Sequence, residues 1–169
     1  HAAAVIDRAL LGGLVEGAVA RALVASCPEG ALLAVGNSTP VRDLDAYCHA
    51  SSRDVRVLHQ RGASGIDGLL SGAAGARSVA EAPVALLLGD LSLLHDLSAL
   101  ALVARARGPL VVVVVQNGGG RIFEQLPIAR AVGAELFERC FATPALVRFA
   151  DAAAAFGVPF ARVETPAEL

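Results

Sequence analysis

Short apolar runs alternate along the chain with stretches in which apolar residues recur at helical spacing. The two clearest runs, 84–88 and 110–115, are rich in branched residues and bounded by turn residues. Such runs are typical of strands that are buried on both faces of a parallel sheet. Between them, the segment 91–107 has helical periodicity and ends at a stop signal, Gly108-Pro109. The pattern therefore predicts a strand–helix–strand unit, around which the rest of the chain is arranged.

The same alternation continues on both sides of this unit. Further helices are expected at 3–25, 40–48, 66–78 and 144–156, and further strands at 31–35, 55–59 and 160–163. The segment 127–140 has no clear periodicity, and we interpret it as a flexible loop. Repeated strand–helix alternation with right-handed crossovers predicts an α/β fold, doubly wound, with a mainly parallel six-stranded sheet and helices on both faces.

Length and composition suit one domain with a sizeable core. The 169 residues are 55% hydrophobic, and 14 basic residues stand against 16 acidic ones, which gives a formal net charge of −2. Because the chain has no basic stripe, nucleic acid is not expected as a partner. No apolar run reaches the roughly 20 residues that a membrane span needs, and no signal peptide pattern opens the chain. An anionic ligand would therefore be held by a metal ion and local dipoles, not by the net charge.

The three cysteines, Cys27, Cys48 and Cys140, are odd in number and form no CxxC motif. Reduced thiols in the cytoplasm fit this usage better than a disulfide framework or a zinc site. The chain has no methionine and begins with His1. A natural chain ordinarily begins with methionine, so we expect residues 1–169 to be one domain, a fragment of a longer protein.

Polar residues follow both strands of the central unit. Gly89-Asp90 ends the first strand, and the second runs into Gln116 and Asn117, followed by three glycines. In open α/β sheets ligands bind outside the carboxyl ends of the strands, so Asp90 and Asn117 should face one crevice. A carboxylate, an amide oxygen and a backbone carbonyl from the glycine turn suit an octahedral Mg²⁺ that also binds phosphate oxygens.

A second anion site is expected after the strand at 31–35. Ser38 and Thr39 precede Pro40, and proline is favoured in the first turn of a helix after a hydroxyl cap. The free amides of that helix end, together with the Ser38 hydroxyl, suit an anion. From this pattern alone, a plain N-cap without a ligand remains the alternative.

Four motifs, in this order, resemble those of one enzyme family. They are GNSTPVR at 36–42, RGASGIDG at 61–68, GDLSLLHDL at 89–97 and NGGGRIF at 117–123. The last two resemble the thiamine diphosphate motif that is usually written GDG…NN, although Leu91 replaces its second glycine and Gln116 its first asparagine. Together the four resemble the C-terminal cofactor domain of the 2-succinyl-5-enolpyruvyl-6-hydroxy-3-cyclohexene-1-carboxylate (SEPHCHC) synthases of menaquinone biosynthesis, from about residue 14 to about residue 127.

The resemblance implies thiamine diphosphate and Mg²⁺ as cofactors. The implied metal ligands are Asp90, Asn117 and Gly119. The implied cofactor-binding residues are Ser38, Ile66, Gly89, Asp90, Leu91, Ser92, Asn117, Gly119, Ile122 and Phe123. In this family Ile66 would support the bent shape of the cofactor. The substrate-binding residues would be Arg42, Arg61 and Leu126, and the two guanidinium forks suit a substrate with several carboxylates.

By the same resemblance, the intact enzyme would be a transferase that decarboxylates 2-oxoglutarate and adds the succinyl unit to isochorismate. In this family a glutamate that activates the cofactor comes from the N-terminal domain of the neighbouring subunit, so no catalytic residue is expected within this chain. The full-length enzyme would be a homodimer or homotetramer. Residues 1–169 alone would hold the diphosphate half of the site and show little or no turnover.

Two other interpretations stay open. One is a domain of another thiamine diphosphate enzyme, of the acetolactate synthase or 2-oxo acid decarboxylase type; Leu91 and the 61–68 loop argue against it. The other is a doubly wound binding module, for a nucleotide or a protein partner, without chemistry. Gln116 in place of the usual asparagine supports this module, whereas the lack of GxGxxG and GxxxxGK(S/T) motifs weakens its nucleotide version.

Overall fold

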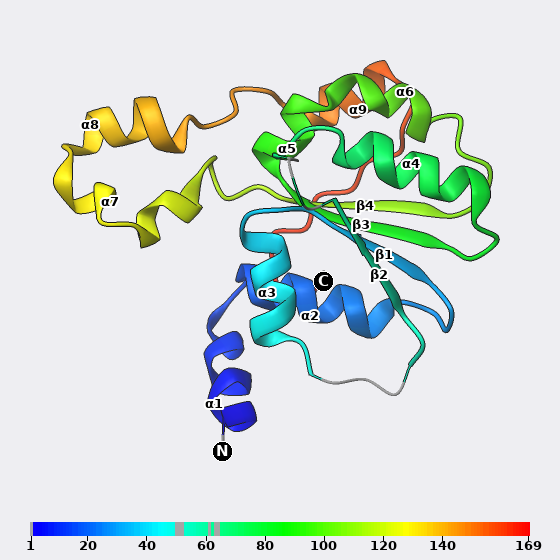
Figure 1. Ribbon diagram of the computed structural model, residues 1–169, viewed down its shortest axis with the longest axis horizontal. Helices are drawn as coiled ribbons and strands as arrows, with labels where there is room; N and C mark the ends of the chain where they lie inside the picture. The colour runs from blue at the N-terminus through cyan, green and yellow to red at the C-terminus, as the bar shows by residue number, and fades with distance from the viewer. Residues whose placement is uncertain (1, 50–52, 61, 63–64) are drawn as a thin grey trace.

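The computed structural model describes residues 2–49, 53–60, 62 and 65–169, and its centre is a parallel sheet (Figure 1). The strands are β1 (Leu32–Val35), β2 (Arg56–His59), β3 (Val84–Gly89) and β4 (Leu110–Val115). They lie in the order β2-β1-β3-β4, and each neighbouring pair is parallel. The register places Gly89 beside Val115, so the polar residues that follow β3 and β4 start at the same edge of the sheet.

Helices of different lengths connect and flank these strands. The α-helices are α1 (Ala2–Ala9), α2 (Glu16–Ser26), α3 (Thr39–Tyr47), α4 (Leu69–Val79), α5 (Asp90–His95), α6 (Leu100–Val103), α7 (Ile128–Ala131), α8 (Ala134–Phe137) and α9 (Phe149–Ala155). Three 3-10 turns, η1 (Leu10–Gly12), η2 (Leu97–Ala99) and η3 (Arg121–Gln125), and one π-helical turn, η4 (Glu138–Ala142), complete the elements of the described residues.

Helices cover both faces of the sheet (Figure 1). Alternate strand residues point to opposite faces, so each strand contributes side chains to two hydrophobic clusters. On one face, Leu32 and Leu86 belong to a hydrophobic cluster that includes residues of α4, α5, α6 and α9. On the other face, Leu33 and Val35 pack with residues of α2 and α3. Leu33 and Leu86 have exposed fractions of 0% and 1%, so the middle of the sheet is fully buried. The α/β class and the helices on both faces are confirmed.

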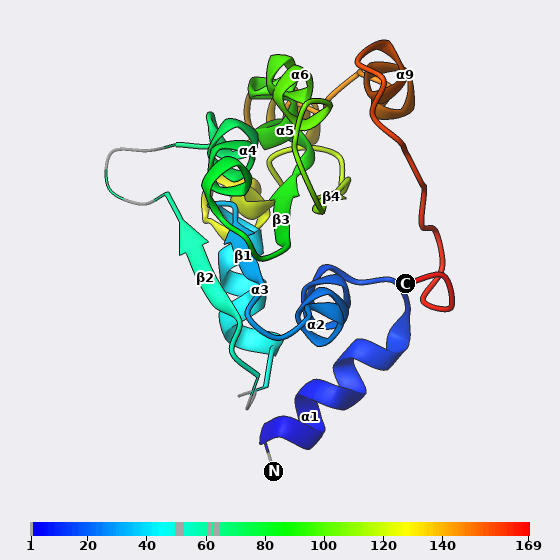
Figure 2. The ribbon, with the colours of Figure 1, turned by 90° about the vertical axis from the view of Figure 1, so that its right-hand side faces the viewer.

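The number of strands differs from the prediction of six, because the described residues form a sheet of four. The segment 160–163, which is expected to be the last strand, is exposed and has no regular secondary structure. Its apolar residues give it strand propensity, but propensity without a partner does not make a strand. The segment 55–59 does form a strand, β2, and this strand is the exposed edge of the sheet beside β1 (Figure 2).

The helix expected at 3–25 is broken in two. α1 continues into η1, which ends at Gly12. Gly13 then has a φ of 145°, and α2 begins at Glu16. The two helical parts are bent by 110° relative to each other. A φ in this range is accessible to glycine and costly for other residues. Glu16 therefore lies at a helix N-terminus and not in the middle of a long helix.

The helix expected at 91–107 is also interrupted. α5 ends at His95, and η2 and α6 continue the path. At the break, the Asp96 carboxylate accepts hydrogen bonds from the Ser71 backbone N–H (2.7 Å) and the Ser71 hydroxyl (2.9 Å). Asp96 thus joins this segment to the first turn of α4, which itself begins at Leu69, three residues later than expected.

No single helix of the described residues is long and apolar enough to cross a membrane. The bent pair Ala3–Gly12 and Glu16–Ser26 passes that test by length and composition when its two parts are taken together.

The contact between α2 and α3 gives a first prediction. Gly17 lies against the Tyr47 ring, and a Cβ at this position would stand 2.5 Å from Tyr47 Cδ2. Gly17→Ala should destabilise the fold by about 1–3 kcal/mol, because the ring and the helix must move apart. Thermal unfolding measures this.

A matched control is Gly75→Ala within α4, where nothing lies within 4 Å of an added Cβ. There alanine should raise stability by roughly 0.5–1 kcal/mol, because glycine is the weaker helix former. Shifts of the same sign in both variants would contradict the close contact at Gly17.

Candidate functional site

The Asp90 carboxylate joins the ends of β3 and β4. Asp90 is the first residue of α5 and is 2% exposed. Its Oδ2 accepts hydrogen bonds from the backbone N–H groups of Gly118 (3.1 Å) and Gly119 (2.9 Å), and its Oδ1 accepts one from Leu91 (2.7 Å). The structure therefore brings Asp90 and the glycine turn after Asn117 together at adjacent strand ends, as the sequence predicts.

The Asn117 side chain is held from the other end of the chain. Its Nδ2 donates a hydrogen bond to Oε1 of Glu16, the first residue of α2. Asp43 lies on the neighbouring helix α3. Burial raises the pKa of its carboxyl to about 6, and repulsion from the nearby Glu16 charge raises this pKa further. The sequence analysis identified neither acidic residue. Glu16 was placed inside a continuous helix, where nothing marks it.

The glycine turn also contacts the segment that returns after it. We call residues 121–142 the arm, which in Figure 1 extends away from the sheet with α7 and α8 at its far end. The Gly120 N–H donates to the Ala142 carbonyl at 2.6 Å. Gly119 has a φ of 102°, and a Cβ there would stand 2.0 Å from the Ala142 oxygen. Glycine is thus required at 119 by conformation and by space.

The arm is not the flexible loop that was expected at 127–140. It folds into η3, α7, α8 and η4. Arg121 bridges Glu124 (2.9 Å) and Glu138 (2.7 Å) across its base, and the Phe123 and Phe141 rings meet edge to face at 6.0 Å. These contacts join the first segment of the arm, η3, to its last segment, η4. Apolar patterning alone missed this, because the stabilising contacts are ion pairs and an aromatic pair.

Ser38 is the N-cap residue of α3, as expected, but its backbone is unusual. Its φ of 73° and ψ of −133° lie in a region that costs a non-glycine residue free energy, and its hydroxyl makes no capping hydrogen bond. Arg42, one turn into α3, donates from Nη1 to the Ser38 carbonyl at 2.5 Å. Strained residues of this kind concentrate at functional sites.

Asn37 is a further polar residue of this edge that the sequence analysis did not identify. It is 6% exposed, and its Nδ2 donates to the carbonyls of Gln60 (2.9 Å) and Gly65 (2.6 Å). It thereby ties the loop after β2 to the end of β1. A polar residue two positions after a fully buried strand was the available signal.

Residues 43–169 match the protein family described as "Thiamine pyrophosphate enzyme, C-terminal TPP binding domain". The chain belongs to this family. Thiamine pyrophosphate is another name for thiamine diphosphate.

The chain is similar to curated SEPHCHC synthases, among them those of two organisms. It is 65% identical over 160 residues to that of Sorangium cellulosum (strain So ce56), covering 92% of this chain and 26% of the relative. It is 47% identical over 156 residues to that of Myxococcus xanthus (strain DK1622), with the same coverage of 92% and 26%. The chain therefore spans 26% of the length of these relatives.

Solved structures agree on the fold. The chain is similar to the Rhodococcus jostii RHA1 thiamine diphosphate-dependent 4-hydroxybenzoylformate decarboxylase, with a TM-score of 0.71 and 21% identity over 92% of this chain and 29% of that one. It is also similar to a putative thiamin diphosphate-dependent enzyme from Mycobacterium smegmatis, with a TM-score of 0.63 and 22% identity over 93% and 28% of the two chains. At these identities the likeness concerns the fold alone.

The carboxyl edge of this thiamine pyrophosphate domain fits a magnesium ion. A carboxylate has about four lone-pair sites, and the three amides that bind Asp90 leave room for one cation. Within the described part of the chain, no three His, Cys, Asp or Glu side chains gather into a metal-binding group. A metal would therefore need the Asn117 amide oxygen and the Gly119 carbonyl beside Asp90, and these hard oxygen ligands are the type that Mg²⁺ prefers.

Of the other residues predicted for the site, those next to Asp90 in the chain lie at the same edge of the sheet. Leu91 and Ser92 follow Asp90 in the first turn of α5, and Ser92 is buried. Ile66 is half-buried and precedes α4. Gly89 ends β3. Arg61 lies outside the described residues. In the arm, Ile122 is half-buried, and Phe123 and Leu126 are exposed by 37% and 49%.

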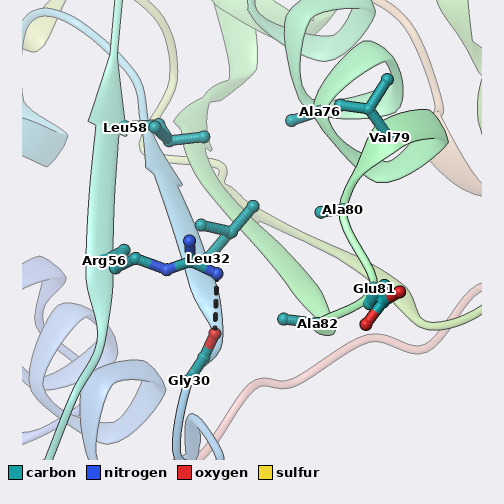
Figure 3. Close-up of a pocket in the computed structure, with 9 residues that line it drawn as sticks. All are labelled: Gly30, Leu32, Arg56, Leu58, Ala76, Val79, Ala80, Glu81 and Ala82. Carbon is teal, nitrogen blue, oxygen red and sulfur yellow. Dashed lines mark hydrogen bonds between the residues drawn. The ribbon is translucent and has the colours of Figure 1, made fainter.

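A pocket lies elsewhere in this thiamine pyrophosphate domain, among the described residues (Figure 3). It measures about 870 Å³ and is lined by Gly30, Leu32, Arg56, Leu58, Ala76, Val79, Ala80, Glu81 and Ala82. Leu32 and Arg56 are the first residues of β1 and β2, so this pocket opens near the amino ends of the strands. Its polar groups are few, and Arg56 already donates to the Gly30 carbonyl at 3.5 Å. We therefore assign the candidate site to the carboxyl edge.

The glycine turn yields a second prediction. Gly119→Ala should destabilise the fold by roughly 1–3 kcal/mol or more, because alanine disfavours this φ and its Cβ overlaps the Ala142 carbonyl. Chemical denaturation of the purified chain measures the change. Gly89→Ala is the control, since nothing lies within 4 Å of its added Cβ and its φ is negative. Equal stability of the Gly119 variant and the parent would refute the close contact between Gly119 and the Ala142 carbonyl.

Asp43 yields a prediction about pH. Its pKa rises from 3.8 to about 6 on folding, so the folded state binds this proton more tightly than the unfolded state. Stability from this group is complete below pH 3.8 and is lost as the pH rises through about 6. Asp43→Asn should therefore raise the melting temperature at pH 7.5 by about 2–4 °C, a modest shift because solvent screens a half-exposed group.

At pH 4 the gain from Asp43→Asn should nearly vanish, because most of the parent's destabilisation has not yet developed at that pH. Differential scanning calorimetry at both values tests the difference. Asp45→Asn, an exposed carboxylate on the same helix, is the control. A gain that does not depend on pH would disprove the role of Asp43 ionisation.

Proposed function

We propose that this chain is the thiamine diphosphate-binding domain of a SEPHCHC synthase. The observation that carries the proposal is the joining of Asp90 and the glycine turn at adjacent strand ends, in a chain that is 65% identical to a SEPHCHC synthase over 160 residues. The full-length enzyme is a transferase that decarboxylates 2-oxoglutarate and adds the succinyl unit to isochorismate in menaquinone biosynthesis. Another type of thiamine diphosphate enzyme and a module without chemistry are less well supported, because three curated relatives that are 46–65% identical to this chain are all SEPHCHC synthases.

The residues at the carboxyl edge have separate roles in this proposal. Asp90, Asn117 and the Gly119 carbonyl would hold Mg²⁺, and the ion would supply positive charge for the diphosphate. When bound, thiamine diphosphate supplies the electron sink for decarboxylation. The α3 N-terminus, an anion-binding end of a nine-residue helix, receives phosphate oxygens together with the Ser38 hydroxyl. These groups bind and orient the cofactor, and catalysis takes place beyond them.

The neighbouring surfaces hold the rest of the cofactor and the substrates. Gly89, Leu91 and Ser92 shape the wall of the crevice beside Asp90, and Ile66 supports the cofactor from the loop before α4. Ile122, Phe123 and Leu126, on the first limb of the arm, cover the cofactor and exclude water. Arg42 and Arg61 bind the carboxylates of 2-oxoglutarate and isochorismate, since a guanidinium matches a carboxylate with two hydrogen bonds.

The partners of the domain follow from the same proposal. The activating glutamate comes from the N-terminal domain of a neighbouring subunit, in a cytoplasmic homodimer or homotetramer. The three thiols support a reducing compartment, since Cys27, Cys48 and Cys140 are all free. Residues 1–169 alone therefore hold the diphosphate half of the site and show little or no turnover.

The decisive experiment follows carbon dioxide release by the full-length enzyme. 2-Oxoglutarate, isochorismate, thiamine diphosphate and Mg²⁺ should together give release and formation of the succinyl adduct, detected by mass spectrometry. Omission of isochorismate should remove the adduct. If the enzyme consumes pyruvate and forms acetolactate instead, the proposal is wrong.

Asp90 gives the corresponding binding prediction. In the full-length enzyme, Asp90→Asn keeps an oxygen that accepts from the glycine amides but removes the charge that faces the metal. The Mg²⁺-dependent affinity for thiamine diphosphate should fall by more than about 100-fold. Loss of a residue that only supports a metal ligand costs about 10–100-fold, and loss of a ligand should cost more. Isothermal titration calorimetry measures it. Asp45→Asn should bind as the parent does. Parent-like affinity in the Asp90 variant would remove this residue from the metal site.

A further inference from the structure

We propose that Glu16 is a positioning residue that holds the Asn117 side-chain amide with its oxygen turned toward the metal. The inference rests on the proposed function, because it needs Asn117 as a metal ligand. It concerns a residue with no metal contact of its own, located 101 positions earlier in the chain.

The chemistry of the contact sets the orientation of the amide. An asparagine side chain has a donor end and an acceptor end, and a rotation by 180° exchanges them. A carboxylate can only accept hydrogen bonds. The Asn117 Nδ2 therefore faces Glu16 Oε1, and the amide oxygen is left on the opposite side. Without Glu16, the NH₂ group can turn into the metal position, where it is not a ligand.

The fold places Glu16, the first residue of α2, within hydrogen-bond distance of the Asn117 side chain. The chain turns at Gly13 and α2 begins at Glu16, so its side chain projects from the first turn of the helix. The next residue, Gly17, allows α2 to lie directly against Tyr47 of α3. The helix end is thereby fixed relative to α3, whose N-terminus forms another side of the site.

A simpler role for Glu16 has to be separated from this one. An acidic residue in the first turn stabilises a helix through its dipole, by about 0.3–1 kcal/mol. That role depends on charge alone, whereas positioning depends on an acceptor oxygen at the correct reach. Two variants distinguish them: Glu16→Gln keeps the acceptor and removes the charge, and Glu16→Asp keeps the charge and shortens the side chain by one methylene.

The test measures metal affinity and not turnover. In the full-length enzyme with saturating thiamine diphosphate, Mn²⁺ replaces Mg²⁺ and its binding is followed by electron paramagnetic resonance. Glu16→Asp and Glu16→Ala should weaken Mn²⁺ binding about 10-fold or more, the range that loss of an outer-shell partner gives. Glu16→Gln should stay within about fivefold of the parent, the effect of one helix-terminal charge.

A double-mutant cycle supplies the control for a general structural effect. In an Asn117→Ala background, Glu16→Ala should weaken Mn²⁺ binding no further, because there is no amide left to orient. Melting temperatures without metal should differ little between Glu16→Gln and Glu16→Asp. Additive losses in the cycle, or a Gln variant as weak as the Ala variant, would overturn the positioning role.

The same titrations separate the two proposals. If Asp90→Asn binds Mn²⁺ and thiamine diphosphate as the parent does, the metal site itself is wrong, and the role of Glu16 fails with it. If Asp90→Asn loses binding while Glu16→Asp and Glu16→Ala keep it, the metal site stands and only the inference about Glu16 fails.

Discussion

The carboxyl edge of the sheet depends on how one buried carboxylate is neutralised. Asp90 is removed from water at the end of β3, and an ion in that position is unfavourable unless polar groups surround it. Backbone amides of the glycine turn and of Leu91 supply these groups. The turn must therefore follow β4 closely and adopt conformations that bring successive N–H groups to one side. The contact of Gly119 and Gly120 with the returning arm follows from that turn.

The sequence predicts this part of the site well, because its determinants are local. The branched runs that form β3 and β4 have few alternatives to a buried parallel pair, and the first residues after neighbouring parallel strands must meet at one edge. The sequence alone thus places Asp90 and Asn117 at the same edge of the sheet. The same holds for the N-terminus of α3, which Pro40 marks, although the strained backbone of Ser38 could not be foreseen from residue type.

The parts that sequence reasoning missed depend on contacts between distant residues. The break at Gly13 decides whether Glu16 is an ordinary helix residue or a helix terminus, and a helical stripe on both sides of the break conceals it. The role of Asn37 depends on its hydrogen bonds to two backbone carbonyls of a loop more than twenty residues away. The arm is fixed by Arg121 and its two glutamates, and apolar periodicity does not report ion pairs. The segment 160–163 shows the converse error, since a strand needs a neighbour as well as propensity.

The contact between Glu16 and Asn117 has a consequence for how the domain folds. The two residues stand 101 positions apart, so closing this contact costs more chain entropy than any pairing of successive strands. Local units such as β3-α5-β4 lose less entropy and form sooner, in keeping with the slower folding of chains rich in distant contacts. The contact between Glu16 and Asn117 is therefore completed late, when α2 docks beside α3. During synthesis on the ribosome, the amide of Asn117 can meet its acceptor only after the chain up to residue 117 has emerged.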